Sequence, residues 1–125
     1  MATEFSAADV PVDATTHVVT VHGEIDIFTA PEFKERISAA IDAGRDLVVV
    51  DLADTTFIDS SSLGVLISAH RRLSGRDGRL VIACDVPSVL NTFKITGLDG
   101  VLEIVPARDD ALAPSADGAG ERDAA

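Results

Sequence analysis

The segment Leu47-Val48-Val49-Val50 is a continuous run of apolar, mostly β-branched residues. A run of this kind is typical of a strand that is buried on both faces, at the centre of a largely parallel sheet. Parallel strands need a crossover connection, usually a helix, between one strand and the next. The 125 residues of the chain are enough for a single domain built in this way.

Amphipathic segments lie on both sides of this strand in the sequence. The first is expected to begin at Thr29, which has capping-box spacing to Glu32, and to end at Gly44. Its apolar residues recur on one stripe, formed by Ala30, Phe33, Ile37, Ala40 and Ile41. Together these features predict a helix that packs against the sheet.

A second helix is expected after the segment Asp59-Ser60-Ser61-Ser62. A projection at about 100° per residue predicts that this helix buries Leu63, Leu66, Ile67, His70 and Leu73. In the same register Ser61, Val65 and Ser68 point away from the core. A valine beside small polar side chains on an outer face suggests a surface that another protein covers.

The other expected elements complete an alternation of strands and helices. They are strands at residues 3–12, 17–22, 80–84 and 101–105 and a third helix capped by Asp85. Pro11 restricts the first strand to an edge of the sheet, where it can pair antiparallel with the next strand. His17 and His22 are expected at solvated strand ends, and Cys84 is expected to be a buried thiol.

These elements predict an α/β domain over residues 1–108, in which helices alternate with the strands of a mostly parallel sheet. Residues 109–125 are expected to form an acidic, disordered tail. The chain carries 10 Lys and Arg against 21 Asp and Glu, a net charge of −11. An acidic chain of this kind is not expected to bind the phosphates of a nucleic acid or the surface of an anionic membrane. Without a spanning segment or a signal peptide, a cytoplasmic protein with no membrane insertion is expected.

Conventional catalytic signatures are missing from the sequence, including the GxSxG elbow, the Walker loop and GxGxxG. Two polar motifs follow strands instead: Gly23-Glu24-Ile25-Asp26 and Asp59-Ser60-Ser61-Ser62. Because the carboxyl ends of parallel strands meet at one edge of a sheet, we expect the two motifs to lie close together. One serine is enough to cap a helix, so three in a row suggest a further role.

Together the motifs resemble a STAS domain, and specifically the bacterial anti-sigma factor antagonists. The resemblance runs over residues 10–108 and includes Gly23 to Asp26, the β-branched strand, and Phe57 to Leu66. In that family the second motif reads Asp-Ser-(Ser/Thr)-Gly-aliphatic-Gly. Ser62 stands here where the family has the first glycine, a change expected to alter the loop conformation or the choice of partner.

The resemblance implies a partner switch that regulates transcription, as in stress responses. Ser60 would be phosphorylated by an anti-sigma factor that is also a serine kinase, and a metal-dependent serine phosphatase would reverse the step. The unphosphorylated domain would bind that anti-sigma factor and free a sigma factor. The partner-binding residues implied are Asp26, Asp59, Ser60, Ser61, Gly64, Val65 and Ser68. ATP or ADP would belong to the kinase, so no cofactor, metal or catalytic residue is expected in this chain.

Two other functions are compatible with the sequence. One is a STAS module that binds its partner without phosphorylation, within a larger signalling or lipid-transport assembly. Ser62 in place of glycine favours this alternative, whereas the intact Asp59-Ser60 pair counts against it. The other is a hydrolase that uses Ser60 with His22 or His70. A serine nucleophile needs a positioned base, and His70 lies two turns or more along the helix from Ser60.

Overall fold

The computed structural model describes residues 5–112. The strands are β1 (Ser6–Pro11), β2 (Thr16–Ile25), β3 (Leu47–Ile58), β4 (Arg79–Ala83) and β5 (Glu103–Val105). The helices are α1 (Ala30–Asp42), α2 (Ser60–Ser74), α3 (Pro87–Ile95) and α4 (Arg108–Leu112), with a 3₁₀ turn, η1, at Leu98–Gly100. Within residues 5–112 no helix has the length and apolar character needed to cross a membrane.

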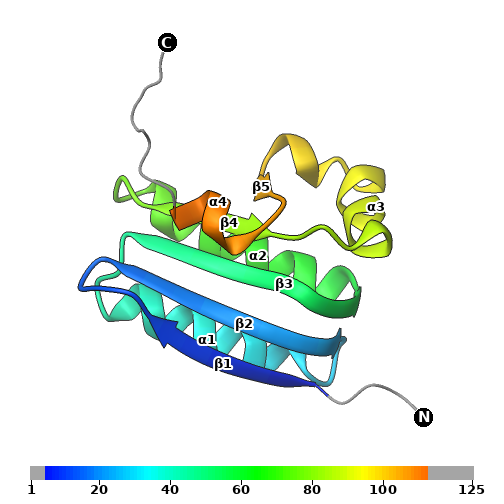
Figure 1. Ribbon diagram of the computed structural model, residues 1–125, viewed down its shortest axis with the longest axis horizontal. Coiled ribbons are helices and arrows are strands. Elements are labelled where there is room, and N and C mark those ends of the chain that lie inside the picture. Colours follow the sequence, from blue (N-terminus) through cyan, green and yellow to red (C-terminus); the bar gives the residue numbers. More distant parts are fainter. Residues whose placement is uncertain (1–4, 113–125) are drawn as a thin grey trace.

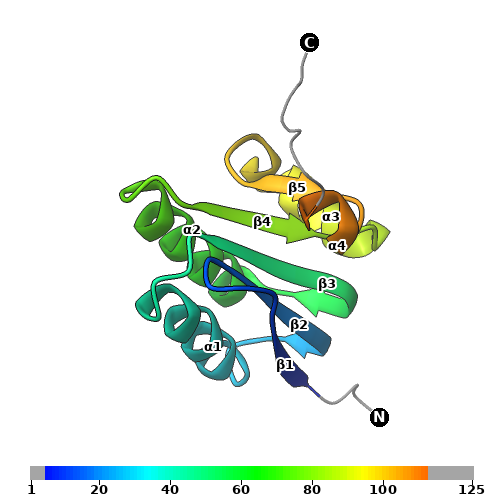
Figure 2. The ribbon, with the colours of Figure 1, turned by 60° about the vertical axis from the view of Figure 1, so that its left-hand side comes forward.

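The strands form one sheet in the order β1-β2-β3-β4-β5. β1 is antiparallel to β2, and all other neighbours are parallel. Each crossover moves one strand further in the same direction, so right-handed crossovers bring α1, α2 and α3 to the same face of the sheet (Figures 1 and 2). The predicted alternation of helices with a mostly parallel sheet is confirmed.

β3 is the central strand, and its apolar run is buried on both faces, as predicted. Val48, Val49 and Val50 have no exposed surface. Val48 and Val50 belong to the main core beneath the helices, whereas Val49 belongs to a smaller cluster on the opposite face. That smaller cluster also contains Val18, Val81, Ala83 and Ala111. Ala111 comes from α4, which therefore covers part of the second face.

The apolar stripe predicted for α1 is buried, and Gly44 follows the helix with a φ of +89°, a conformation that favours glycine. The predicted capping box does not form, since the side chain of Thr29 makes no cap bond. Its hydroxyl oxygen instead accepts from the N–H of Asp26 at 2.9 Å, and its proton is donated to the carbonyl of Glu24 on β2 at 3.1 Å. Asp85 does not cap α3 either, because that helix begins after Val86.

β2 is longer than the strand predicted at residues 17–22 and continues through Gly23 to Ile25. Gly23 has a φ of +89° and lies where the register between β2 and β3 shifts. A glycine permits a bulge of this kind without strain, and the strand then resumes. Glu24 and Ile25 therefore belong to the strand, and Asp26 begins the loop.

β1 lies at the edge of the sheet, as expected, and Asp9 ties it to its neighbours. The Asp9 carboxylate lies 2.9 Å from Nε2 of His17 and 2.5 Å from Nη1 of Arg36 on α1. Burial favours the neutral carboxyl, but the bonds from His17 and Arg36 outweigh that effect and lower the pKa of Asp9. The prediction of a solvated His17 is therefore wrong, whereas His22 is exposed, 3.2 Å from Asp54.

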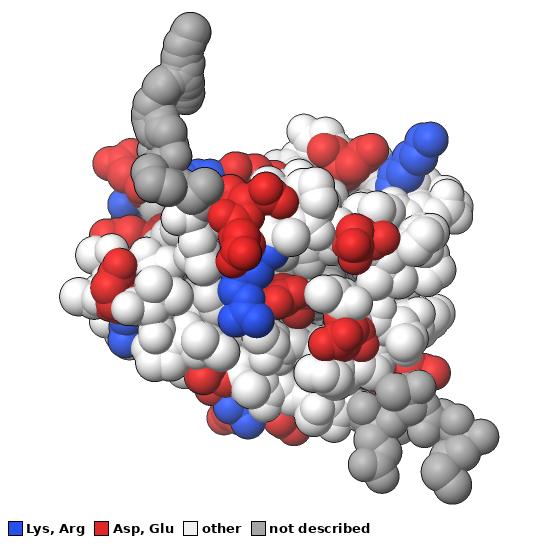
Figure 3. All heavy atoms as spheres, viewed as in Figure 1, with Lys and Arg blue, Asp and Glu red and all other residues white. Residues whose placement is uncertain are grey.

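Helix α4 lies on the face of the sheet opposite α1, α2 and α3. It begins at Arg108, the residue at which the domain was expected to end. Ala111 is buried there, and Nε of Arg108 lies 3.3 Å from Oδ2 of Asp51 on β3. Figure 3 shows this side of the molecule, where acidic side chains are more numerous than basic ones. The rest of the expected tail, residues 113–125, lies outside the described residues, as do residues 1–4.

Candidate functional site

The two polar motifs meet at the carboxyl ends of β2 and β3, at the right-hand end of the sheet in Figure 1. Ile25 pairs with Ile58 at the last register position of the two strands. The backbone N–H of Asp59 then donates to the Ile25 carbonyl at 3.2 Å. The prediction that both motifs lie at one sheet edge is confirmed, at the place where α/β domains commonly carry their sites.

Asp59 is the N-cap residue of α2, and its carboxylate accepts a 3.2 Å hydrogen bond from the backbone N–H of Ser62. The Ser62 hydroxyl is fully buried, 2.9 Å from the carbonyl of Ile25 and 3.2 Å from the Asp59 carboxylate. A hydroxyl has one proton to donate, and the shorter distance assigns it to Ile25. The side chain that replaces the family glycine is therefore accommodated inside the fold.

The three consecutive serines differ in their exposure. Ser60 is exposed, Ser61 is half-buried and Ser62 has no exposed surface. Another protein can therefore reach the Ser60 hydroxyl from solution, whereas it could reach Ser62 only if the first turn of α2 opened. This order agrees with the choice of Ser60 over its neighbours as the candidate phosphoacceptor.

The outward face of α2 is rotated relative to the predicted one. The buried residues of the helix are Ser62, Leu63, Leu66, Ala69 and Leu73. A buried serine and a small alanine thus belong to the stripe, whereas Ile67 and His70 lie at its margin and are only half-buried. On the opposite side, about one turn apart, lie the exposed residues Ser60, Gly64 and Ser68.

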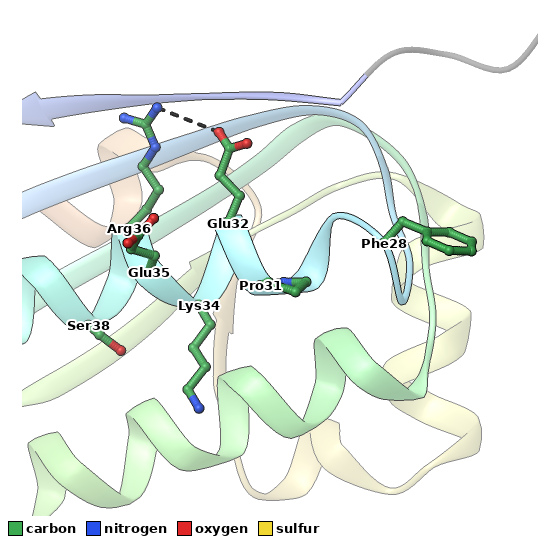
Figure 4. A pocket seen from close by; sticks show the side chains of 7 residues that line it. All are labelled: Phe28, Pro31, Glu32, Lys34, Glu35, Arg36 and Ser38. Atoms are coloured by element: carbon green, nitrogen blue, oxygen red, sulfur yellow. Dashed lines mark ion pairs between the residues drawn. The ribbon is translucent and has the colours of Figure 1, made fainter.

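The prediction that Val65 points outward is wrong, because this side chain is half-buried and packs against the main core. It lines a groove of about 250 Å³ between α1 and α2, together with Lys34, Ile37, Ser38, Ile41, Ser68, Ala69 and Arg72. Figure 4 shows Lys34 extending from α1 toward α2. A substitution of Val65 would therefore disturb the packing of the two helices, so Gly64 is the cleaner probe of the outward face.

Asp26 organises the loop between β2 and α1. Its Oδ1 accepts hydrogen bonds from the backbone N–H groups of Phe28 at 2.9 Å and Thr29 at 3.1 Å. The Thr29 hydroxyl accepts from the N–H of Asp26 at 2.9 Å and donates to the Glu24 carbonyl. These bonds close a compact turn of the kind that aspartate favours. Asp26 is half-buried and fixes the backbone of the loop.

Three large apolar side chains at this edge are exposed, and the sequence-based prediction missed them. Ile27 is 64% exposed, Phe28 86% and Phe57 48%. Phe57 pairs with Glu24, just before the loop of Ile27 and Phe28, so all three residues lie at the same end of the sheet. Phe57 precedes the core residue Ile58 and therefore points to the face opposite the helices. Figure 4 shows the ring of Phe28 directed away from α1. The sequence did contain a signal for this exposure, because Ile27 and Phe28 are adjacent apolar residues in a turn, where polar residues are usual.

The same corner carries negative charge. Residues 23–33 and 52–70 build it and contain no Lys or Arg. They contain five acidic residues: Glu24, Asp26, Glu32, Asp54 and Asp59. Basic side chains border the same corner on α1, where Phe28 lines one hollow with Lys34 and Arg36, and Nη2 of Arg36 lies 3.6 Å from the Glu32 carboxylate.

No catalytic arrangement surrounds Ser60 in the part of the chain that the structure describes. The hydrolase alternative would need a histidine beside its hydroxyl, but His22 lies beside Asp54 and His70 is half-buried on α2. Over residues 5–112 no three His, Cys, Asp or Glu residues are grouped as metal ligands would be. Cys84 is buried, as predicted, and burial raises the pKa of its thiol, which disfavours the reactive thiolate.

This chain is similar to known proteins in sequence and in fold. Residues 7–111 match the family model of the STAS domain. The anti-sigma-B factor antagonist of Listeria monocytogenes is 34% identical over 91 residues, which are 72% of this chain and 80% of the relative. The crystal structure of an anti-sigma factor antagonist from Mycobacterium paratuberculosis has a TM-score of 0.81 at 29% identity and covers 87% of this chain and 92% of its own.

The anti-sigma factor antagonist SpoIIAA shares the fold in two forms. Its unphosphorylated form has a TM-score of 0.77 at 22% identity and covers 93% of this chain and 100% of its own. The phosphorylated form of SpoIIAA from Bacillus has a TM-score of 0.68 at 23% identity, with 86% and 96% covered.

Proposed function

The chain belongs to the STAS domain family, and we propose that it is an anti-sigma factor antagonist switched by phosphorylation of Ser60. In the unphosphorylated form it binds an anti-sigma factor and so frees a sigma factor. The anti-sigma factor is itself the serine kinase, and a metal-dependent serine phosphatase restores the binding form. The exchange takes place in the cytoplasm.

The accessibility of the Ser60 hydroxyl is the observation that carries this proposal. Ser60 is the exposed member of the three serines and stands at the start of α2, next to the Asp26 loop. Asp59 caps the helix, and the buried hydroxyl of Ser62 anchors its first turn. A kinase can therefore reach the Ser60 oxygen without unfolding the helix.

Phosphorylation transfers the γ-phosphoryl group of ATP, which the kinase holds, to the Ser60 oxygen. The bond between the γ-phosphorus and the oxygen that bridges to the β-phosphate breaks, and a bond from phosphorus to Oγ of Ser60 forms. The hydroxyl proton passes to a base of the kinase, and ADP leaves. This chain supplies only the acceptor oxygen.

The phosphoryl group adds a charge of about −1.5 to −2 to a surface that the partner must cover. The N-terminus of α2 stabilises this charge by about 0.3–1 kcal/mol, so the fold accommodates it. The complex is weakened because the group occupies the contact surface and must be desolvated there. A loss of about 2–3 kcal/mol corresponds to roughly 30- to 150-fold weaker binding, enough to exchange partners without a conformational change.

The relatives support this proposal. The name of the Listeria protein gives it an anti-sigma-B factor as its target, and SpoIIAA is known in unphosphorylated and phosphorylated forms. Ser62 in place of glycine does not count against a phosphorylation switch, because its side chain is buried and leaves the outward face of α2 free.

The test is phosphorylation by purified ATPases. Small ATPases of the histidine-kinase-like class from the same genome are incubated one at a time with this protein, Mg²⁺ and ATP, and the intact mass of the protein is measured. We expect one phosphoryl group on the wild-type chain, none on Ser60→Ala and one on Ser61→Ala. A group that persists on Ser60→Ala would move the site. A complex without phosphorylation would favour a STAS module that only binds.

A further inference from the structure

We propose that the groove between α1 and α2 receives an apolar side chain of the anti-sigma factor, and that Lys34 at its border pairs with a carboxylate beside that side chain. The inference rests on the proposed function, because the partner is the protein that phosphorylates Ser60. It extends the contact surface from the start of α2 to its middle turns and adds the chemistry that the partner presents there.

The groove runs beside the outward face of α2, which begins at Ser60. Ser68 belongs to both, because it is exposed on that face and also lines the groove. It follows Ser60 by about two turns of the helix, or about 12 Å. A protein interface of standard size buries about 800 Å² of each partner. A partner that covers Ser60, Gly64 and Ser68 therefore reaches the mouth of the groove.

The size and the lining of the groove suit a single side chain. Its volume is about 250 Å³. Sites that enclose a small molecule are usually larger, at roughly 300–1,000 Å³. Ile37, Ile41 and Ala69 are the buried apolar residues of its lining, and the half-buried Val65 lies beside them. An apolar side chain inserted between the two helices would pack against these four residues and be removed from water.

The charged residues that line the groove are both basic. They are Lys34 on α1 and Arg72 on α2. Arg72 already pairs with Asp42 at 2.5 Å, whereas none of the ion pairs within residues 5–112 involves Lys34. In a chain of net charge −11, this is an unusual place for a cation beside apolar side chains. A carboxylate of the partner would complement the Lys34 ammonium, whereas a cation there would be repelled.

The acidic residues of α1 lie outside the groove. Figure 4 shows Lys34 and Ser38 pointing toward α2, whereas Glu32 and Arg36 point toward β1. Lys34 also borders a second hollow on the outer face of α1, which Glu32 and Glu35 line. The Glu32 carboxylate lies 3.6 Å from Arg36, and neither glutamate lines the groove. Neither of them therefore takes the place of a partner's carboxylate between the helices.

The test measures the affinity of the phosphorylating ATPase for four variants by isothermal titration calorimetry. Lys34→Glu is compared with Lys94→Glu, which changes the net charge equally at an exposed position on α3. Ser38→Leu fills the groove from α1, and Ser74→Leu adds the same side chain at an exposed position outside the groove. We expect binding to weaken at least about ten-fold in Lys34→Glu and Ser38→Leu, and less than about three-fold in the two controls.

Two further readouts separate docking from chemistry and from misfolding. The rate of Ser60 phosphorylation at saturating concentrations of Lys34→Glu should equal that of the wild type, because Lys34 does not belong to the acceptor site. The concentration that gives half of this rate should rise with the loss of affinity. The circular dichroism spectra of all four variants should match that of the wild type.

Each outcome supports or overturns the inference. If no ATPase phosphorylates Ser60 of the wild type, the proposed function and this inference fail together. If the wild type is phosphorylated and Lys34→Glu binds as well as Lys94→Glu, the inference fails while the proposed function stands. Equal affinities of Ser38→Leu and Ser74→Leu would rule out the inserted side chain in the same way. If sedimentation shows that the chain alone forms a dimer that Ser38→Leu dissociates, the occupant is a second copy and the inference is overturned.

Discussion

The buried hydroxyl of Ser62 donates a 2.9 Å hydrogen bond to the carbonyl oxygen of Ile25 and so joins the first turn of α2 to the last residue of β2. The N–H of Asp59 donates to the same carbonyl at 3.2 Å. The loop that carries Asp26 and the helix start that carries Ser60 are therefore one unit. The backbone that carries Ser60 is held at the sheet edge by the bonds of its neighbours Asp59 and Ser62.

Removing this anchor is expected to lower the free energy of unfolding. Ser62→Ala loses one hydrogen bond, a loss of about 1 kcal/mol. Ser62→Gly is expected to lose up to about 1 kcal/mol more, because glycine gives up more backbone entropy in a helix. Urea unfolding followed by far-UV circular dichroism suits a chain without Trp or Tyr. Ser74→Ala, at an exposed position in the last turn of α2, is the control. A Ser62→Ala variant as stable as the wild type would contradict the anchoring role.

Most of the fold could be predicted because its signals are local. The apolar run at residues 47–50 and the helical spacing of the segments beside it were sufficient for a parallel sheet with helical crossovers. The failures arise where a tertiary contact competes with a local one. The hydroxyl of Thr29 has the spacing of a cap, but its oxygen accepts from the N–H of Asp26 at 2.9 Å and not from an N–H of the helix. Likewise His17, placed beside Asp9 by the pairing of β1 with β2, could not be recognised as an ion-pair partner from its own strand.

The candidate site was predicted less completely than the fold. The motif singled out Ser60 and Asp59 as candidates, and the structure places both at the start of α2. The outward face of α2 was misplaced because hydrophobicity alone does not reveal that Ser62 is buried, and its burial depends on a carbonyl from β2. The exposure of Phe28 depends on the turn that Asp26 closes, and residue type alone would have assigned this phenylalanine to the core.

Asp9 is expected to make stability depend on acid pH. Burial of its carboxylate works against ionisation, but the bonds from His17 and Arg36 outweigh that effect and lower its pKa. The pKa of an aspartate in the unfolded chain is 3.8, and the pKa of Asp9 in the folded chain is lower. The ionised carboxylate therefore contributes its full stabilisation above pH 3.8, and this contribution is lost as the pH falls through the folded-state pKa. Asp9→Asn should therefore be less stable than the wild type at neutral pH, and the difference should close below about pH 4. Urea midpoints between about pH 7 and pH 3 test this, and a difference of constant size would rule out the ionised carboxylate as its cause.

Ser60→Glu is expected to separate binding from stability. The carboxylate carries one negative charge where the phosphoryl group carries about −1.5 to −2, so affinity for the phosphorylating ATPase should fall by at least about ten-fold, a smaller loss than phosphorylation causes. The free energy of unfolding should change by less than about 1 kcal/mol, because a negative charge is favourable at the start of a helix. Ser60→Ala should bind like the wild type. Calorimetry and urea unfolding measure the two quantities, and a loss of stability that matched the loss of affinity would indicate damage to the fold.

Gly64 lies one turn after Ser60 on the outward face of α2, where an added Cβ would meet no atom within 4 Å. Alanine at an exposed helix position is more stable than glycine by about 0.5–1 kcal/mol, so Gly64→Ala should raise the urea midpoint. The same variant should bind the phosphorylating ATPase about ten-fold more weakly, because the glycine lets the partner approach the helix backbone closely. Ser74→Ala also improves helix propensity but lies far along α2 from Ser60, so it should leave affinity unchanged. A Gly64→Ala variant that gained stability and kept full affinity would place the second turn of α2 outside the interface.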